Sequence, residues 1–235
     1  MDDGHIFKLF DEELTALKEK ILLEGSLVQT AVQNAIVALQ ERDSDLARRV
    51  IEDDDLVNAK EVEIDEFCHR LLALRQPAAK DLRLITTAIK INNDLERMGD
   101  MAVNVCERVL EINLEPPLKP YIDLPQIAEI AQTMIQKSLE AFVKGDTQLA
   151  WKVTGDDERV DQLHEQIFRE LLTYMSQDMK TIPRATRLLL ISRYLERFAD
   201  HAVNIAELVI FLVEGKIVRH QTPRGKRNSP PSEIS

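Results

Sequence analysis

Two copies of one acidic motif are the part of this sequence that could do chemistry. The pattern Leu-Glu-Arg-x-x-Asp-x-Ala-Val-Asn occurs at residues 95–104 and again one hundred positions later, at 195–204. Side chains at i, i+4 and i+8 share one face of an α-helix, so each copy predicts a strip of oxygen atoms. The strips consist of Glu96, Asp100 and Asn104 in the first copy and Glu196, Asp200 and Asn204 in the second.

A second acidic strip precedes each motif. The first half of the chain offers Asp54, Asn58, Glu61 and Asp65, and the second half offers Asp157, Asp161 and His164 before Phe168 breaks the pattern. If antiparallel helices set these strips side by side, unpaired carboxylates would raise one another's pKa, so a cation is their natural partner. Oxygen ligands with at most one imidazole suit Mg, Mn, Ca or Fe better than a metal that prefers thiolates.

A solvated helix face is the alternative reading of these strips. Acids at i and i+4 are common on exposed helices, and Arg97 and Arg197 follow the two glutamates and could neutralise them. Against this, the strips recur in register, and Glu96 interrupts an otherwise apolar stripe, where a carboxylate needs a partner. We therefore favour metal binding and keep the solvated strip as the alternative.

Apolar residues at helical spacing predict the elements that position these strips. The fold class is all-α, with six long helices expected at about 7–40, 44–74, 77–110, 126–143, 147–176 and 182–212. Matching residues recur at an offset of 103 in the early helices and 100 in the last, which indicates a duplicated unit of three helices. We predict two tandem, pseudo-symmetric three-helix bundles: 6–112, a proline-rich linker at 113–125, 126–218, and a disordered tail at 222–235.

The net charge, the length of the apolar runs and the cysteines limit the classes of function that this chain can have. A formal net charge of −11 argues against a nucleic-acid-binding surface, which needs clustered Lys and Arg. The clean apolar run Leu208 to Val213 is too short to cross a bilayer and no signal peptide opens the chain, so we expect a cytoplasmic protein that meets membranes only through partners. Cys68 and Cys106 lie in apolar helical patterns and are expected to be reduced core residues.

The doubled motif resembles the signature of the PhoU family, and so does the segment Arg75 to Arg83, which resembles the family's opening of the third helix. The resemblance covers the chain from about Leu9 to Val218. It implies two three-helix bundles with Glu/Asp-x-x-x-Asp motifs that hold metal, sometimes as multinuclear iron or zinc clusters. The cofactor expected is thus Fe, Zn, Mn or Mg. The positions that match the motif are Glu61 with Asp65, Glu96 with Asp100, Asp157 with Asp161, and Glu196 with Asp200. Asp54, Asn58, Asn104, His164 and Asn204 remain possible additional ligands, and the pair His164 and Phe168 makes the second site the weaker one.

The same resemblance implies a regulator and not an enzyme. The expected role is negative regulation of the phosphate-starvation response and modulation of phosphate uptake. Contacts would be made with the ATPase subunit of the phosphate ABC transporter and with a phosphate-sensing histidine kinase, by a homodimer. One alternative is a metalloenzyme of the di-iron carboxylate type, whose bundles use paired Glu-x-x-His motifs that Asp161 to His164 approaches. The other is a purely structural helical adaptor whose strips are solvated.

Overall fold

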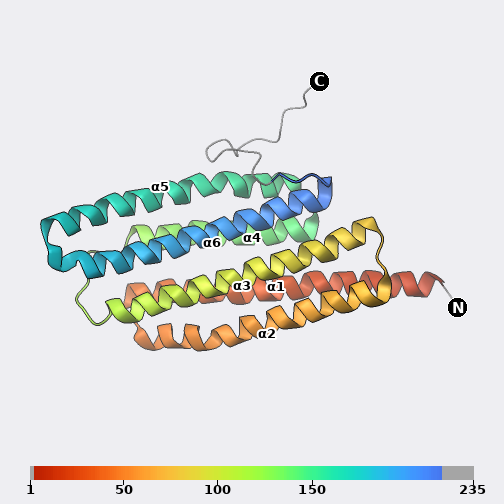
Figure 1. Cartoon of the computed structure of the whole chain (residues 1–235), viewed down its shortest axis with the longest axis horizontal. Helices are drawn as coiled ribbons and strands as arrows, with labels where there is room; N and C mark the ends of the chain where they lie inside the picture. The colour runs from red at the N-terminus through yellow and green to blue at the C-terminus, as the bar shows by residue number, and fades with distance from the viewer. Residues whose placement is uncertain (1–2, 219–235) are drawn as a thin grey trace, which may run out of the picture.

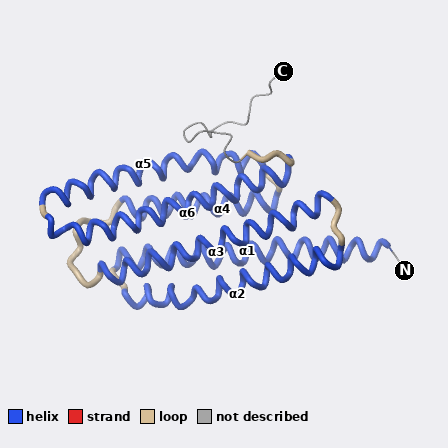
Figure 2. Tube along the Cα trace, viewed as in Figure 1, coloured by secondary structure: helices blue, strands red, loops and turns tan. Residues whose placement is uncertain are grey.

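Helices make up almost all of the computed structural model, which describes residues 3–218. The six long helices are α1 (Asp3–Glu41), α2 (Ser44–Arg75), α3 (Ala79–Ile112), α4 (Asp123–Lys144), α5 (Thr147–Gln177) and α6 (Ile182–Glu214), with a short 3₁₀ helix, η1 (Met179–Thr181), before the last. Figure 2 shows these helices joined by loops, with no strand in the described part of the chain. The all-α prediction is confirmed.

The helices form two antiparallel three-helix bundles that lie side by side (Figure 1). The first contains α1 to α3 and the second α4 to α6, as predicted, and they meet where α3 packs on α6 and α1 packs on α4. Buried apolar residues from all six helices form one continuous core. Each bundle therefore shares its apolar interior with the other, and the two cores do not stand alone.

The duplication is visible in how the helices begin. Asp43 caps the N-terminus of α2 by accepting hydrogen bonds from two backbone N–H groups at 2.8 and 2.9 Å. Asp146 caps α5 in the same way at 3.0 Å. The residues before them, Arg42 and Gly145, both adopt the left-handed conformation, with φ of 58° and 66°. The short turn between the first two helices of each bundle thus has the same construction in both halves.

The linker prediction of 113–125 needs a correction. Helix α3 ends at Ile112 and α4 begins at Asp123, so Pro125 lies in the first turn of α4 and the expected helix start at 126 is too late. Proline fits there because the N–H groups of a first helical turn have no partner within the helix. At the other end of the chain, the tail expected at 222–235 lies outside the described residues.

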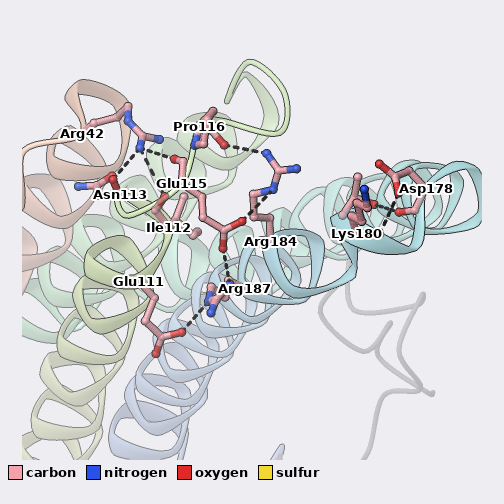
Figure 3. Close-up of polar contacts among 11 residues, drawn as sticks. Arg42, Glu111, Ile112, Asn113, Glu115, Pro116, Asp178, Lys180, Arg184 and Arg187 are labelled. Atoms are coloured by element: carbon pink, nitrogen blue, oxygen red, sulfur yellow. Dashed lines mark hydrogen bonds and ion pairs between the residues drawn. The ribbon is translucent and has the colours of Figure 1, made fainter.

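Arginines from both bundles hold the linker in place (Figure 3). Arg42 donates to the backbone carbonyls of Asn113 at 3.0 Å and Glu115 at 2.6 Å, and Arg184 donates to the carbonyl of Pro116 at 3.0 Å. Arg187 pairs with the Glu115 carboxylate at 3.3 Å. The linker therefore ties the bundles together and does not act as a free tether.

Helix α1 is long and apolar enough over Lys8–Glu41 to cross a membrane, by length and composition only. In the structure, side chains such as Leu17, Ile21 and Val28 are fully buried in the shared core. Packing in the bundle therefore accounts for the composition of this helix. Cys68 and Cys106 are buried free thiols in the same core, and burial raises the pKa of each to about 12.

Candidate metal centre

The two acidic strips of the first bundle lie against each other between α2 and α3. A Cβ atom at Gly99 would lie 3.1 Å from Oδ1 of Asp54, so the absence of a side chain at Gly99 lets Asp54 approach α3 between Glu96 and Asp100. Burial raises the pKa of Asp54, and Asp100 raises it further. Burial and then Asp100 raise the pKa of Glu96 in the same way, with added contributions from Glu61 and Asp54. The predicted side-by-side arrangement is present here.

Helix α1 adds a carboxylate that sequence reasoning missed. Glu24 is fully buried (0% exposed), and neither of its carboxylate oxygens has a hydrogen-bond partner among the described residues. Burial raises the pKa of Glu24 to about 9, with Glu61 and then Glu96 as further causes. A buried carboxyl without a donor is unusual because its desolvation is uncompensated. The first bundle thus contributes an acid to this region from each of its three helices.

The remaining predicted residues of the first bundle lie at its edge. Asp65 is partly exposed, with Oδ2 3.3 Å from Nδ1 of His69. Asn58 is exposed and donates to Asp54 at 3.0 Å. Asn104 donates its amide to the backbone carbonyl of Asp100 at 2.7 Å, so that amide is used within its own helix. The carboxylates closest to Glu24 are therefore the better candidates for ligands.

Few cations balance the acids of the first bundle. Arg97 lies 3.4 Å from Glu96 and 3.2 Å from Asp100, but its side chain is more than half exposed. Lys20 and Lys60 are both paired with Glu63 and hold its pKa down to about 2. Over residues 3–218, no three His, Cys, Asp or Glu side chains are arranged to hold a metal as they stand. Ligation would therefore require the carboxylates to turn toward one another.

The second bundle neutralises its matching acid internally. Glu196 is almost fully buried, and Nη1 of Arg193 lies 2.8 Å from each of its two carboxylate oxygens. One hundred positions earlier, the residue matching Arg193 is Asn93, which is exposed. The two halves thus carry the same motif with different charge compensation.

Two other positions of the second bundle also carry less negative charge than the matching positions of the first bundle. His164 stands at the position of Glu61, and its Nδ1 lies 2.8 Å from the hydroxyl of the buried Ser192. Burial lowers the pKa of His164, and Arg193 lowers it further. At the offset of 103, Ile127 takes the place of Glu24. Of the other predicted ligands, Asp157 is buried and Asp161 and Asp200 are half-buried.

Asn204 is not part of the second acidic strip. Its amide and Nδ1 of His201 both face Oδ1 of Asp94, at 3.4 and 2.8 Å, across the contact between α6 and α3. No motif in the sequence singles out His201. The two residues form a polar contact between the bundles, because the helix turn that carries Asn204 faces the neighbouring bundle.

One Glu-x-x-His motif does occur, from Glu66 to His69 on α2. Both end residues are exposed, and none of the other histidines has a Glu three positions before it. A di-iron carboxylate bundle needs such a motif on each of two helices, facing inward. This chain therefore lacks the ligand set of that enzyme class.

Comparison with known sequences agrees with the repeat seen in the structure. The family model for the PhoU domain matches residues 21–109 and again 124–209. The chain belongs to the PhoU family. It is 46% identical over 214 residues to a phosphate-specific transport system accessory protein PhoU homolog of Aquifex aeolicus, covering 91% of this chain and 96% of the relative.

Solved structures of the family have the same fold. The crystal structure of PhoU from Pseudomonas aeruginosa superposes with a TM-score of 0.85 at 43% identity, covering 88% of this chain and all of that one. The structure of the phosphate transport system regulatory protein PhoU from Streptococcus pneumoniae gives 0.83 at 32% identity, covering 89% and 99%. The fold and the family are thus established together.

Proposed function

We propose that this chain is an accessory protein of phosphate transport that restrains the phosphate-starvation response. Membership of the PhoU family supports this role. So do the names of its relatives, which describe accessory and regulatory proteins of the phosphate transport system. The chain would act as a cytoplasmic homodimer through contact with the ATPase subunit of the phosphate ABC transporter and with a phosphate-sensing histidine kinase. Long helices joined through one core offer a rigid surface for such partners.

The single observation that carries a metal-dependent form of this role is the buried carboxylate of Glu24. Its two oxygens lie in a region that also receives Glu61 and Glu96, and among residues 3–218 no lysine or arginine forms an ion pair with it. A cation would supply the missing partner and allow all three acids to ionise. An all-oxygen donor set suits Mg, Mn or Fe(II), with Zn the less favoured choice.

The cation would brace α1, α2 and α3 of the first bundle by holding one acid from each. Asp54 and Asp100 would complete the set from the adjoining turns, with Asp65 and Asn58 at its rim. The second bundle's acids, Asp157, Asp161, Glu196 and Asp200, would bind a cation more weakly, because Arg193 would have to release Glu196 first. Metal would thus be held mainly by the first bundle.

A catalytic role has less support. The nearest arrangement to a nucleophile and base is Ser192 with His164, but the Ser192 side chain is completely buried and no substrate could reach it. The di-iron alternative lacks its second Glu-x-x-His motif. The purely structural adaptor remains the competing function, and it differs from our proposal in needing no metal.

Regulation can be tested in cells that lack the native protein. The wild-type chain should restore low expression of a phosphate-starvation reporter in phosphate-rich medium and should capture the transporter's ATPase subunit from a membrane extract. Glu24→Gln combined with Glu96→Gln should weaken repression, whereas Glu12→Gln with Glu52→Gln, two exposed acids, should not. Full repression by the double variant would favour the structural adaptor, and failure of the wild type to repress would overturn the regulatory role.

A further inference from the structure

A cavity of about 600 Å³ lies where α3 begins and α4 and α6 end, with α1 alongside. Figure 1 shows that these three helix ends gather at the same end of the molecule, the one from which α1 starts. None of the residues that line the cavity belongs to the candidate metal centre. A volume of this size is within the usual range for small-molecule sites.

The rim of the cavity is positively charged. Among the described residues, one lining side chain is an acid, Asp81, and four are cations: Lys18, Lys80, Arg83 and Lys144. The whole chain carries a net charge of −11, so this concentration of cations runs against its overall balance. The cavity is therefore suited to an anion.

Two of these cations have a structural role that needs no ligand. Lys18 donates to the backbone carbonyl of Val143 at 3.2 Å, near the end of α4, and Arg83 donates to that of Leu212 at 3.3 Å, near the end of α6. Cations commonly satisfy carbonyls at helix C-termini in this way. These two residues alone would not indicate a binding site.

The other two cations donate to no helix-end carbonyl in the part of the chain that the structure describes. Lys144 is the last residue of α4, where the helix dipole favours a cation, and it pairs with the exposed Glu140, one turn earlier, at 2.6 Å. Lys80 is exposed in the first turn of α3 and pairs with no residue in the part of the chain that the structure describes. The N-cap of that helix, Ala78, has no side chain to occupy the first N–H groups of α3. Charge and free backbone donors thus meet at the mouth of the cavity.

Apolar side chains form the remainder of the wall, which consists of Leu84, Val143, Leu212 and Val213 over the fully buried Phe142. A simple inorganic anion would leave this surface unused. A ligand that has an anionic group at one end and an aromatic or apolar body at the other would contact both parts. Phosphoryl groups are among the anions that lysine, arginine and helix N-termini commonly bind.

We propose that this cavity binds a phosphorylated small molecule with an aromatic or apolar body, of which a nucleotide is the simplest class. Lys80, Lys144 and the first N–H groups of α3 would hold the phosphoryl groups, and Leu84 with Val213 would contact the body. The segment Arg75 to Arg83, part of the sequence resemblance, leads directly into this site. The proposal goes beyond the regulatory function and holds whether or not metal binds.

Calorimetric titration of the full-length chain with ADP, adenosine and inorganic phosphate tests the proposal. The protein and buffers should be free of divalent metal, so that phosphate cannot bind through a cation at the acidic centre. We expect ADP to bind roughly tenfold or more tightly than either adenosine or inorganic phosphate, because it alone engages both the charged rim and the apolar wall. Amide NMR shifts on ADP addition should fall at residues 79–84 and 143–145.

The matched variants remove two positive charges in different places. Lys80→Ala with Lys144→Ala should weaken ADP binding by roughly tenfold or more, since two charge-assisted contacts are lost, while its melting temperature stays near that of the wild type. Lys152→Ala with Arg159→Ala, on the exposed side of α5, should leave ADP binding unchanged. The proposal is overturned if ADP does not bind at millimolar concentration, if inorganic phosphate binds as tightly, or if both double variants weaken binding equally.

Discussion

Arg193 places Nη1 2.8 Å from both carboxylate oxygens of Glu196, whereas the matching glutamate of the first bundle, Glu96, pairs with the exposed Arg97 at 3.4 Å. The duplicated motif therefore has two different electrostatic settings. In the second bundle, an arginine from the same helix neutralises the buried acid. In the first bundle, Glu96 lies in a region with Glu24, Glu61 and Asp54, where a cation from solution would stabilise the set.

Removing the internal cation should destabilise the second bundle. Arg193→Gln leaves Glu196 buried without its bidentate partner, and we expect a loss of about 1 to 3 kcal/mol in the free energy of unfolding. The estimate is below the range for fully buried pairs because Arg193 is half exposed. Urea denaturation of the wild type and the variant measures this loss in the free energy of unfolding. Adding Glu196→Gln should recover most of the loss, and a cost in the single variant as small as that of Arg159→Gln would show that the pair contributes little.

Stability of the metal-free protein should depend on pH through Glu24. The pKa of Glu24 is raised to about 9 in the folded state, from 4.5 as its ordinary value, so the folded protein holds a proton that the unfolded chain releases. Stability is therefore greatest below about pH 4.5 for this group and falls as pH rises toward 9. Glu24→Gln should be nearly neutral at pH 4.5, where the protonated carboxyl and the amide are both buried without partners. At pH 7.5 it should stabilise the protein by roughly 4 kcal/mol, because each pH unit above 4.5 contributes about 1.4 kcal/mol.

Unfolding in chelator at the two pH values checks this result, with Glu12→Gln as the exposed control. Equal effects of Glu24→Gln at both pH values would show that the carboxyl is ionised and compensated in the folded state. That outcome would remove the main reason for placing a cation beside it.

The contact between the bundles should be sensitive to Gly25. A Cβ at this position would lie 2.2 Å from Cδ1 of Leu139, across the contact between α1 and α4. Gly25→Ala gains about 1 kcal/mol of helix propensity, yet we expect a net loss of about 1 to 2 kcal/mol because Leu139 must leave its rotamer or the helices must separate. In a Leu139→Ala background the same substitution should become neutral or stabilising. An additive double-mutant cycle would contradict this contact.

Much of the fold could be predicted from the sequence because helical periodicity and duplication are local patterns. The repeated offsets pair residues such as Asp43 with Asp146, whose capping roles are set by neighbours within three positions. The strips of α2 and α3 could be expected to meet because the short connection at Gln76 makes these helices antiparallel neighbours. The end of the linker is harder to predict, since a proline in the first turn of a helix cannot be told from a loop proline by sequence.

The parts that could not be predicted depend on contacts between distant helices. Glu24 is one acid in an amphipathic helix, and only the packing of α1 over α2 and α3 shows that it is buried. One sequence signal was available: at the offset of 103 its counterpart is Ile127, a core residue. By its spacing Asn204 extends the second strip, but its partner Asp94 belongs to the other bundle. No pattern within one helix reveals that contact.

Metal content after loading tests the central claim, that the first bundle is the principal metal site. The chelated protein would be loaded with Fe(II) or Mn(II), freed of unbound ions by gel filtration and analysed by mass spectrometry for metal per chain. We predict that Glu24→Gln and Glu96→Gln each lose most of the bound metal, while Glu196→Gln retains that of the wild type. Equal loss in Glu96→Gln and Glu196→Gln, or no metal above background in the wild type, would contradict the account.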